Sequence, residues 1–584
     1  MLLHELENAK VAPYRWNGKF SQSAETILMQ HLVQCGLSPL SVALSQWLEF
    51  SSVHVEHPLS FILFSNLLEK LVKPIQNGLL KEEEEKLFWE ATKKLLPSCF
   101  NGIRKLRKLI NGDKIILQQL SAILNSYFVP VVSTLTLPEG TDLFPSSVYG
   151  WLTTNENETN CDIRNTLEVA VTQGTEDWFC HILENNATGD TSEEAQLNYL
   201  IRVTQLVRTD LQKAIEYHDK IFQQNSILNY HLYFFTQEVS QLVEPLVTDV
   251  CKSLKPIKIS NRATEENFDN DCLSMGTTLF ELYLVVQKLA ILATGLCPEE
   301  SNAFLIHNFH LWFHAGVAQW LDIALYKALQ RIKKAVELDN LVPVDSSVKY
   351  SSSAVDTLAI FYQIKIFWKQ LAWPDVESSY TFVAKIIDDI CRCSVFFADQ
   401  MGAKVEGMGE TENVYEKKFE WCLAINNIDY VQQSILPFVG ELGMEDIMTA
   451  LANYRNQMAA DHCRQTLQLV IDNAIDTVGN KILELLEKVA EKMAPAIDRF
   501  LLEGAELLNQ ENNYVDRMMK YLDENLLTLH SHLNTDNFNR ILSIIWENLS
   551  HSMYEVVEMN VAKRRPPQFF LNLHETLKIL VGFF

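Results

Sequence analysis

Apolar residues recur every three or four positions along most of this 584-residue chain. In residues 467–500 the positions that share one apolar stripe are Leu467, Ile471, Ile475, Val478, Ile482, Leu485, Val489, Met493 and Phe500. This spacing places them on one face of an α-helix. Pro495 has no backbone N–H, so we expect it to end or kink that helix. A second stripe over 542–556 follows the segment "NTDN", whose polar residues favour a helix start.

Helical periodicity dominates the remaining sequence as well. Comparable patterns cover residues 22–52, 56–78, 80–127, 161–255, 272–339, 350–402 and 414–440. Only "FVPVVSTLTLP" (128–138) has the β-branched residues and flanking prolines of an extended segment, and one strand cannot form a sheet. Long helices without a fixed-period repeat predict an all-α protein made of stacked helical bundles.

Three polar stretches predict linkers or surface loops, at residues 153–161, 258–271 and 402–413. They suggest four helical blocks along the chain. The blocks are an N-terminal bundle at 1–155, a second block at 156–265, a core block at 266–405 and C-terminal bundles at 406–584.

Charge limits the classes of partner. The formal net charge is -25 and the sequence pI is about 5.1, which argues against nucleic-acid binding, because phosphate neutralisation needs a surplus of Lys and Arg. Two local basic clusters remain, and they contain Arg104, Lys105, Arg107 and Lys108 in "IRKLRKLI", and Lys563, Arg564 and Arg565 in "KRRPP". Each is a candidate contact for anionic lipid or an acidic partner. The alternative is that each cluster is structural.

The longest apolar stretch, residues 279–297, predicts a buried helix rather than a membrane span. Glu281, Gln287 and Lys288 interrupt it. The N-terminus has no long apolar run, so we expect no secretory signal. The eleven cysteines have irregular spacing and no CxxC pair, which is typical of reduced thiols in a cytoplasmic protein.

Three histidines form the only arrangement that suggests metal chemistry. On one helix His307, His310 and His314 would lie within roughly 60° of one another. The segment "HLWFH" has Leu311 where a zinc-protease helix carries its catalytic Glu, and no further ligand pattern follows. The other interpretation places these histidines beside an aromatic seam. We therefore expect no metal, cofactor or catalytic residue, and keep a histidine-based metalloenzyme as the minor alternative.

Two segments resemble the homology core of the uncoordinated-thirteen family of vesicle-priming factors, the MUN domain. They are "WFHAGVAQWLD" (312–322) and "SSSAVDTLAIFYQIKIFWKQLAWPD" (351–375). Further blocks agree in the same order: "DLQKAIEYHDKIF" (210–222), "WCLAINNIDYVQQSI" (421–435), "YLDENLLTL" (521–529) and "ILSIIWENL" (541–549). The segment "FFLNLHETLKILVGFF" (569–584) is similar to the branch with the brain-specific angiogenesis-inhibitor-associated protein and the granule-secretion paralogue.

The resemblance implies an elongated, arched rod of helical bundles, similar to subunits of multisubunit tethering complexes. It also implies a non-enzymatic scaffold that binds syntaxin and other SNARE proteins, promotes SNARE assembly, and is peripherally associated with vesicle or plasma membrane. The calcium- and lipid-binding domains that usually flank this domain are not found in the sequence. The alternative is a tethering subunit that does not open syntaxin.

The resemblance also implies a partner contact. An Asn-x-x-Phe pair of the synaptic members aligns with Phe280 and Tyr283, so an aromatic residue is retained and the Asn is not. We expect a contact at Phe280 and Tyr283, with the alternative that both rings fill the core.

Overall fold

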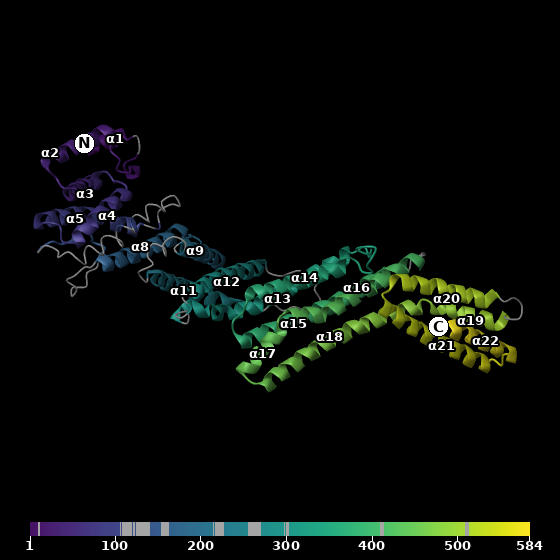
Figure 1. Ribbon diagram of the computed structural model, residues 1–584. Helices are drawn as coiled ribbons and strands as arrows, with labels where there is room; N and C mark the ends of the chain where they lie inside the picture. The colour runs from purple at the N-terminus through teal and green to yellow at the C-terminus, as the bar shows by residue number, and fades with distance from the viewer. Residues whose placement is uncertain are drawn as a thin grey trace. The chain divides into compact units, whose positions relative to one another are not determined.

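Every regular element in the described part of this computed structural model is a helix, apart from an isolated bridge between Pro343 and Ser351 (Figure 1). The all-α prediction is confirmed. The structure describes residues 1–9, 12–105, 140–152, 163–213, 227–254, 270–296, 303–408, 414–507 and 513–583, with single residues 107, 120, 123, 215 and 298. The strand-like segment 128–138 and the polar stretches 153–161 and 258–269 lie outside them.

The helices group into two compact units. Unit 1 contains residues 1–249 and 281–309, and unit 2 contains residues 250–280 and 310–584. The four sequence blocks stay a prediction, because one compact unit can hold more than one block. The arched overall shape also stays a prediction.

Unit 1 begins with short N-terminal helices and continues through longer ones. Its helices are α1 (Leu2–Asn8), a 3-10 turn (Pro13–Arg15), α2 (Gln22–Cys35), α3 (Pro39–Glu56), α4 (Phe61–Gln76), α5 (Glu82–Arg104), α8 (Ile163–Asn186), α9 (Glu193–Lys213) and most of α11 (Ile227–Ser253). Helix α3 packs against α4 and α5, and α5 packs against α8. The rings of Trp47, Phe64 and Phe88 meet at this junction, with centroids 5.7 and 5.8 Å from that of Trp47.

Local sequence explains where these helices start and stop. The pattern over 22–52 is two helices rather than one, because Gly36 adopts a left-handed conformation (φ 61°) that ends α2, and Ser38 caps α3. The acidic run "KEEEEK" forms the first turn of α5, where carboxylates stabilise the helix dipole. The side chain of Glu84 also accepts the backbone N–H of Lys81 at 3.0 Å.

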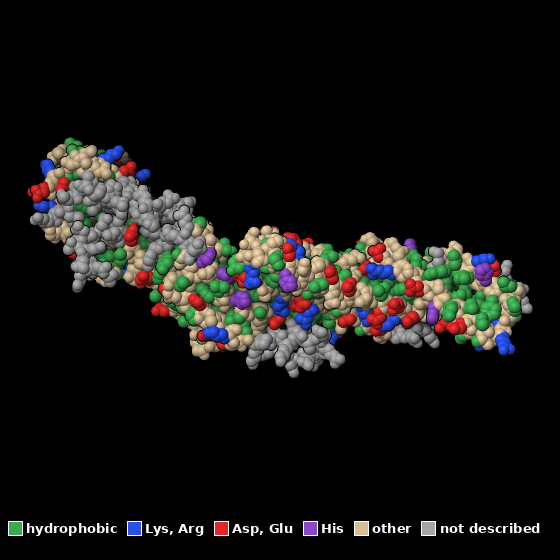
Figure 2. Space-filling view, turned by 90° about the horizontal axis from the view of Figure 1, so that it is seen from below, with side chains coloured by type: hydrophobic (Ala, Val, Ile, Leu, Met, Phe, Trp, Pro, Cys, Tyr) green, Lys and Arg blue, Asp and Glu red, His purple; other side chains and the backbone are tan. Residues whose placement is uncertain are grey.

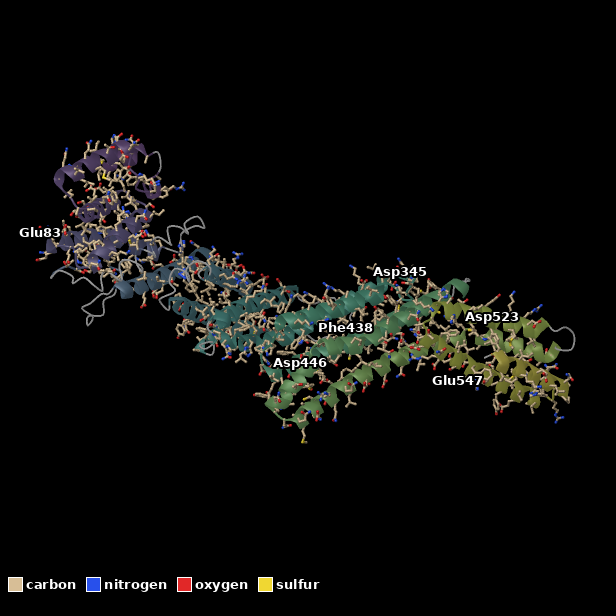
Figure 3. All side chains as sticks on the ribbon, in the orientation of Figure 1. Glu83, Asp345, Phe438, Asp446, Asp523 and Glu547 are labelled. Atoms are coloured by element: carbon tan, nitrogen blue, oxygen red, sulfur yellow. The ribbon has the colours of Figure 1, made fainter. Side chains whose placement is uncertain are left out.

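Unit 2 carries the first part of α12 (Asn270–Leu296) and almost all of α13 (Phe309–Leu338). Its other helices are α14 (Ser352–Leu371), α15 (Val376–Gly407), α16 (Val414–Glu441), α17 (Met444–Tyr454), α18 (Gln457–Glu491), α19 (Ala494–Leu507), α20 (Asn513–His532), α21 (Thr535–Ala562) and α22 (Pro567–Phe583). Helices α15, α16 and α18 pack together, and α19 packs against α20, α21 and α22. Phe438, labelled in Figure 3, contacts Phe361 of α14 with ring centroids 5.6 Å apart, whereas Asp446 and Glu547 are exposed.

Two sequence expectations for unit 2 are confirmed and one is wrong. The long stripe breaks before Pro495, with α18 ending at Glu491 and α19 starting at Ala494. Asn534 of "NTDN" caps α21 by accepting the backbone N–H of Asn537 at 2.9 Å. The loop predicted over 402–413 is wrong for its first six residues, which extend α15. Packing against α18 supports these extra turns, because Gly402 and Val405 are buried and Glu406 pairs with Lys488 of α18 at 2.6 Å.

A buried polar cluster joins the end of α13 to α14 and α16. The side chain of Asn427 accepts the backbone N–H of Ser351 at 2.7 Å and donates to its hydroxyl at 2.6 Å. That hydroxyl donates to Asp339 at 2.6 Å, and Asp339 also accepts the backbone N–H groups of Leu341 and Ser353. None of the three side chains is more than 4% exposed. The cluster therefore satisfies buried polar groups at the two ends of this connection, whose middle residues are mostly exposed.

The preceding residue, Asn426, joins α16 to a second connection. Its amide donates to the backbone carbonyls of Lys349 and His532 at 2.8 and 2.7 Å, and its oxygen accepts the backbone N–H of Asn534 at 3.0 Å. The ammonium of Lys349 donates to the carbonyl of Leu533 at 2.7 Å. Asn426 and Asn427 thus link the α13–α14 and α20–α21 connections to the same helix, α16, by hydrogen bonds.

Unit 1 contains a buried histidine on α3. His54 is 3% exposed, and its Nδ1 accepts the backbone N–H of Leu59 at 2.9 Å. Nε2 therefore carries the proton and donates to the Ser98 hydroxyl at 2.7 Å. Burial lowers the pKa of His54 to about 4.

We expect Asn427→Ala to destabilise the α13–α14 junction by about 1–3 kcal/mol, because it leaves the buried backbone N–H of Ser351 without a partner and removes a donor to its hydroxyl. Hydrogen-exchange mass spectrometry of peptides covering 339–353 measures this local opening. The matched control is Asn473→Ala, at an exposed position of α18. Equal protection of the junction in both variants would contradict the prediction.

We expect unit 1 to lose stability as the pH falls from about 6.5 toward 4. Unfolded His54 gains a proton in this range while the folded residue stays neutral, so protonation favours unfolding. Hydrogen exchange in α3 and α4, corrected for the intrinsic rate at each pH, measures the effect. His54→Gln should be less stable at neutral pH, and its stability should change less with pH than that of the wild type. The same pH dependence in both proteins would contradict the assignment of the effect to His54.

Candidate functional site

An apolar groove lies in the described part of unit 2. It has a volume of about 270 Å³ and lies between the first part of α12, α13 and α14. Its lining residues are Gly276, Thr277, Phe280, Trp320, Ile323, Ala324, Lys327, Ala328, Arg331, Ile360, Gln363, Ile364 and Phe367. No Asp or Glu is among them, so its charged groups are both cationic.

Three aromatic rings form one end of this groove. The Phe280 ring lies 5.0 Å from that of Trp320 and 5.0 Å from that of Phe367, measured between centroids. Trp320 is almost fully buried, whereas Phe280 and Phe367 are half-buried and present part of each ring to the groove. Packing thus fixes the Trp320 ring in the interior, while the edges of the Phe280 and Phe367 rings stay accessible from the groove.

Close approach of α12 to α13 shapes the same end. A Cβ at Gly276 would lie 2.6 Å from Cδ1 of Ile323, so a larger residue would require the Ile323 side chain to move. Glycine therefore permits the contact that brings Phe280 beside α13.

The two cations of the groove lie one helical turn apart on α13. Lys327 is exposed, and the guanidinium of Arg331 donates to the side-chain oxygen of Gln363 on α14 at 2.6 Å. The lining therefore combines an apolar floor with a basic rim. An apolar pocket with a few polar groups at its rim is an arrangement that binds another molecule.

Phe280 and Tyr283, which were both expected to contact a partner, lie in different surroundings. Phe280 lines the groove. Tyr283 has no exposed surface, its ring lies 5.3 Å from that of Phe309 in unit 1, and burial raises its pKa. The ring of Tyr283 thus fills the core, as the alternative interpretation held, and Phe280 is the member of the pair that a partner can reach.

Sequence reasoning did not single out the other groove residues. Trp320 and Phe367 fall inside the quoted segments 312–322 and 351–375, which supported the family resemblance, and Trp320 was also expected in the aromatic seam beside the histidines. Lys327 and Arg331 have the i, i+4 spacing that places two side chains on one helix face, which was the available signal. Nothing in the periodicity indicates that α14 lies beside them.

The first basic cluster is largely neutralised inside unit 1. Arg104 pairs with Asp177 at 2.6 Å, and Arg107 pairs with Asp210 at 2.8 Å with a side chain only 4% exposed. Burial lowers the pKa of Arg107, opposed by the Asp210 charge. Lys105 is exposed. Lys108 lies outside the described residues, so a lipid contact at this cluster stays a prediction that rests on Lys105.

The second basic cluster lies in the connection between α21 and α22. Lys563, Arg564 and Arg565 are all exposed there. Arg565 pairs with Glu506 at 2.8 Å. This cluster therefore presents more accessible charge than the first.

Two of the three histidines, His310 and His314, lie against an aromatic ring. His310 and His314 contact the ring of Trp373, with centroids 5.5 and 6.0 Å away, and His314 also lies 5.4 Å from Phe382. Within the residues that the structure describes, no group of three or more His, Cys, Asp or Glu side chains is placed to hold a metal ion. The contacts follow the aromatic-seam interpretation.

One helix in the described part of the chain is long and apolar enough to cross a membrane. It is residues 273–296 of α12, and half of that window is buried inside the protein. Core helices of soluble proteins show the same properties. The length and composition of this helix therefore do not contradict the prediction that residues 279–297 form a buried helix.

Comparison with known proteins finds relatives of this chain, although Gly276, Thr277 and Phe280 of the groove lie before the matched domain region. The MUN domain model matches residues 285–564, which include all of α13 and α14. Protein unc-13 homolog 4B of Drosophila melanogaster is 45% identical over 593 residues, covering 100% of this chain and 51% of that protein. Human unc-13 homolog D is 23% identical over 571 residues, covering 97% and 49%. Human BAI1-associated protein 3 is 27% identical over 575 residues, covering 97% and 45%.

The chain spans about half the length of these relatives. The sequence-based prediction named the branch that holds the BAI1-associated protein, and the higher identity is with homolog 4B. The matches extend over nearly the whole chain and include the MUN region, so this chain belongs to the unc-13 family.

Proposed function

We propose that this chain is a non-enzymatic scaffold for vesicle docking and priming in regulated exocytosis. It would act in the cytoplasm, peripherally associated with vesicle or plasma membrane, by binding syntaxin and other SNARE helices and promoting their assembly. The observation that carries the proposal is the apolar groove at Phe280, walled by two helices of the region that matches the MUN domain.

The groove suits one face of an amphipathic helix. Such a helix presents apolar residues at i, i+3, i+4 and i+7, and a groove between helices receives them. The half-buried edges of Phe280 and Phe367 offer the apolar contact. Lys327 and Arg331 favour a partner that carries acidic residues beside its apolar stripe.

Assembly would be promoted by proximity. A scaffold that holds one helix in an extended, accessible state removes part of the entropy cost of aligning the others, and no covalent step is needed. This mechanism requires only a rigid groove, and the polar cluster of Asp339, Ser351 and Asn427 supports the α13–α14 connection beside it.

A second candidate is a tethering subunit that does not open syntaxin. It is favoured by Phe280 itself, which stands where the synaptic members of the family carry Asn. A liposome-fusion assay with purified syntaxin complex separates the two proposals. Acceleration by this chain supports the first, and membrane clustering without acceleration supports the second.

We expect Phe280→Ala to weaken binding of SNARE cytoplasmic domains by about ten-fold, because it removes an accessible aromatic contact of the groove. Quantitative pull-down with individual SNARE domains measures the change. The matched control is Tyr362→Ala, on α14, whose ring is 53% exposed and outside the groove lining. Equal binding by wild type and Phe280→Ala would show that the contact lies elsewhere.

We expect the double variant Lys327→Glu/Arg331→Glu to bind the same domains more weakly, and the loss to shrink at high salt. Reversing both rim charges turns attraction into repulsion, and salt screens exposed charges. Lys334→Glu/Lys369→Glu makes the same charge change at exposed positions of α13 and α14 outside the lining. A similar loss of binding in that control would show that the effect comes from net charge and not from the groove.

A further inference from the structure

The connection between α21 and α22 forms an unbroken exposed segment at one end of the C-terminal bundle. Its residues 561–568, "VAKRRPPQ", are all exposed, between buried Asn560 and buried Phe569. It carries three cations and no acid, in a chain of net charge -25. We name this segment the basic turn.

The backbone of the basic turn is defined by hydrogen bonds. The N–H of Arg565 donates to the carbonyl of Asn560 at 3.2 Å, and the N–H of Arg564 donates to that of Val561 at 3.0 Å. These two bonds form the Schellman motif that ends many helices. Pro566 and Pro567 follow, and Pro567 starts α22. The cations are therefore presented by an ordered turn rather than by a long loop.

Arg564 occupies the position of this motif that favours glycine. Its φ is 51°, in the left-handed region where a side chain is strained and glycine is not. The side chain makes no ion pair among the described residues that would offset the strain.

The charges around the turn leave two cations free for a ligand. Glu506, on α19, pairs with Arg565 at 2.8 Å. Within the described part of the bundle, neither Lys563 nor Arg564 has an acidic partner within ion-pair distance. The turn thus retains a net positive charge at the surface.

Aliphatic side chains accompany the cations. Met559 and Val561 at the end of α21 are 51% and 59% exposed, and Leu571 near the start of α22 is 57% exposed. On the face shown in Figure 2, hydrophobic side chains gather over the C-terminal helices, with basic side chains at their outer end. Exposed aliphatic residues beside cations are the combination that contacts both the headgroups and the upper acyl region of a bilayer.

We propose that the basic turn is a contact site for an anionic phospholipid membrane. Lys563 and Arg564 would bind headgroup phosphates and carboxylates, and Val561 and Leu571 would enter the interface. A bilayer is favoured over an acidic protein helix because the turn protrudes with every residue exposed, whereas a helix is bound in a groove. The site is independent of the groove at Phe280, so either proposal can fail alone.

The test is flotation of the full chain with lipid vesicles. We expect binding to phosphatidylcholine vesicles that contain phosphatidylserine, and little binding to phosphatidylcholine alone. Each basic residue near an anionic surface strengthens binding by roughly five-fold, so Lys563→Gln/Arg564→Gly should bind about 30-fold more weakly. The single variant Arg564→Gly should bind about five-fold more weakly while its thermal unfolding shifts upward, because glycine relieves the strained φ.

The opposite signs of these two effects separate lost binding from misfolding. The matched control is Lys520→Gln/Lys578→Gln, which removes two exposed cations of the same bundle that pair with Glu524 and Glu575. It should float as wild type does. The proposal is overturned by wild-type flotation of Lys563→Gln/Arg564→Gly, by equal binding to neutral vesicles, or by binding to soluble polyglutamate and not to vesicles.

Discussion

Burial of apolar helix faces against neighbouring helices is the interaction on which both compact units depend. In unit 1 the rings of Trp47, Phe64 and Phe88 meet where α3, α4 and α5 pack. In unit 2 the stripe of α18 is buried against α15, α16 and α21. Because each helix is apolar along one face, it needs neighbours along its length. Bundles of long helices satisfy that need without a sheet.

Polar groups decide how the bundles are connected. Buried amides and hydroxyls must find partners, and in unit 2 the adjacent residues Asn426 and Asn427 supply them for two inter-helix connections. In unit 1 the neutral ring of His54 plays a comparable part for the start of α4. Each of these buried polar groups needs a hydrogen-bond partner at a set distance and direction. They therefore specify the geometry of the connections more strongly than apolar packing alone does.

The surfaces that helix packing leaves open differ in character. The groove at Phe280 is concave and apolar with a basic rim, whereas the basic turn protrudes and carries free cations. A groove suits a helix and a protruding cationic turn suits a flat anionic surface. Under the proposed function, these two surfaces would give SNARE helices and lipid separate positions on the chain.

The sequence by itself determined the helical class, the break at Pro495, the cap at Asn534 and the family, because periodicity, capping and motif order are local properties. It did not indicate that "GAKVEG" extends α15, since the ion pair that Glu406 makes there is with Lys488 from another helix. It likewise treated Phe280 and Tyr283 alike, and Arg104 like Arg564. Only the tertiary structure decided which ring reaches a groove and which arginine meets an aspartate, because exposure and charge pairing depend on helices distant in the sequence.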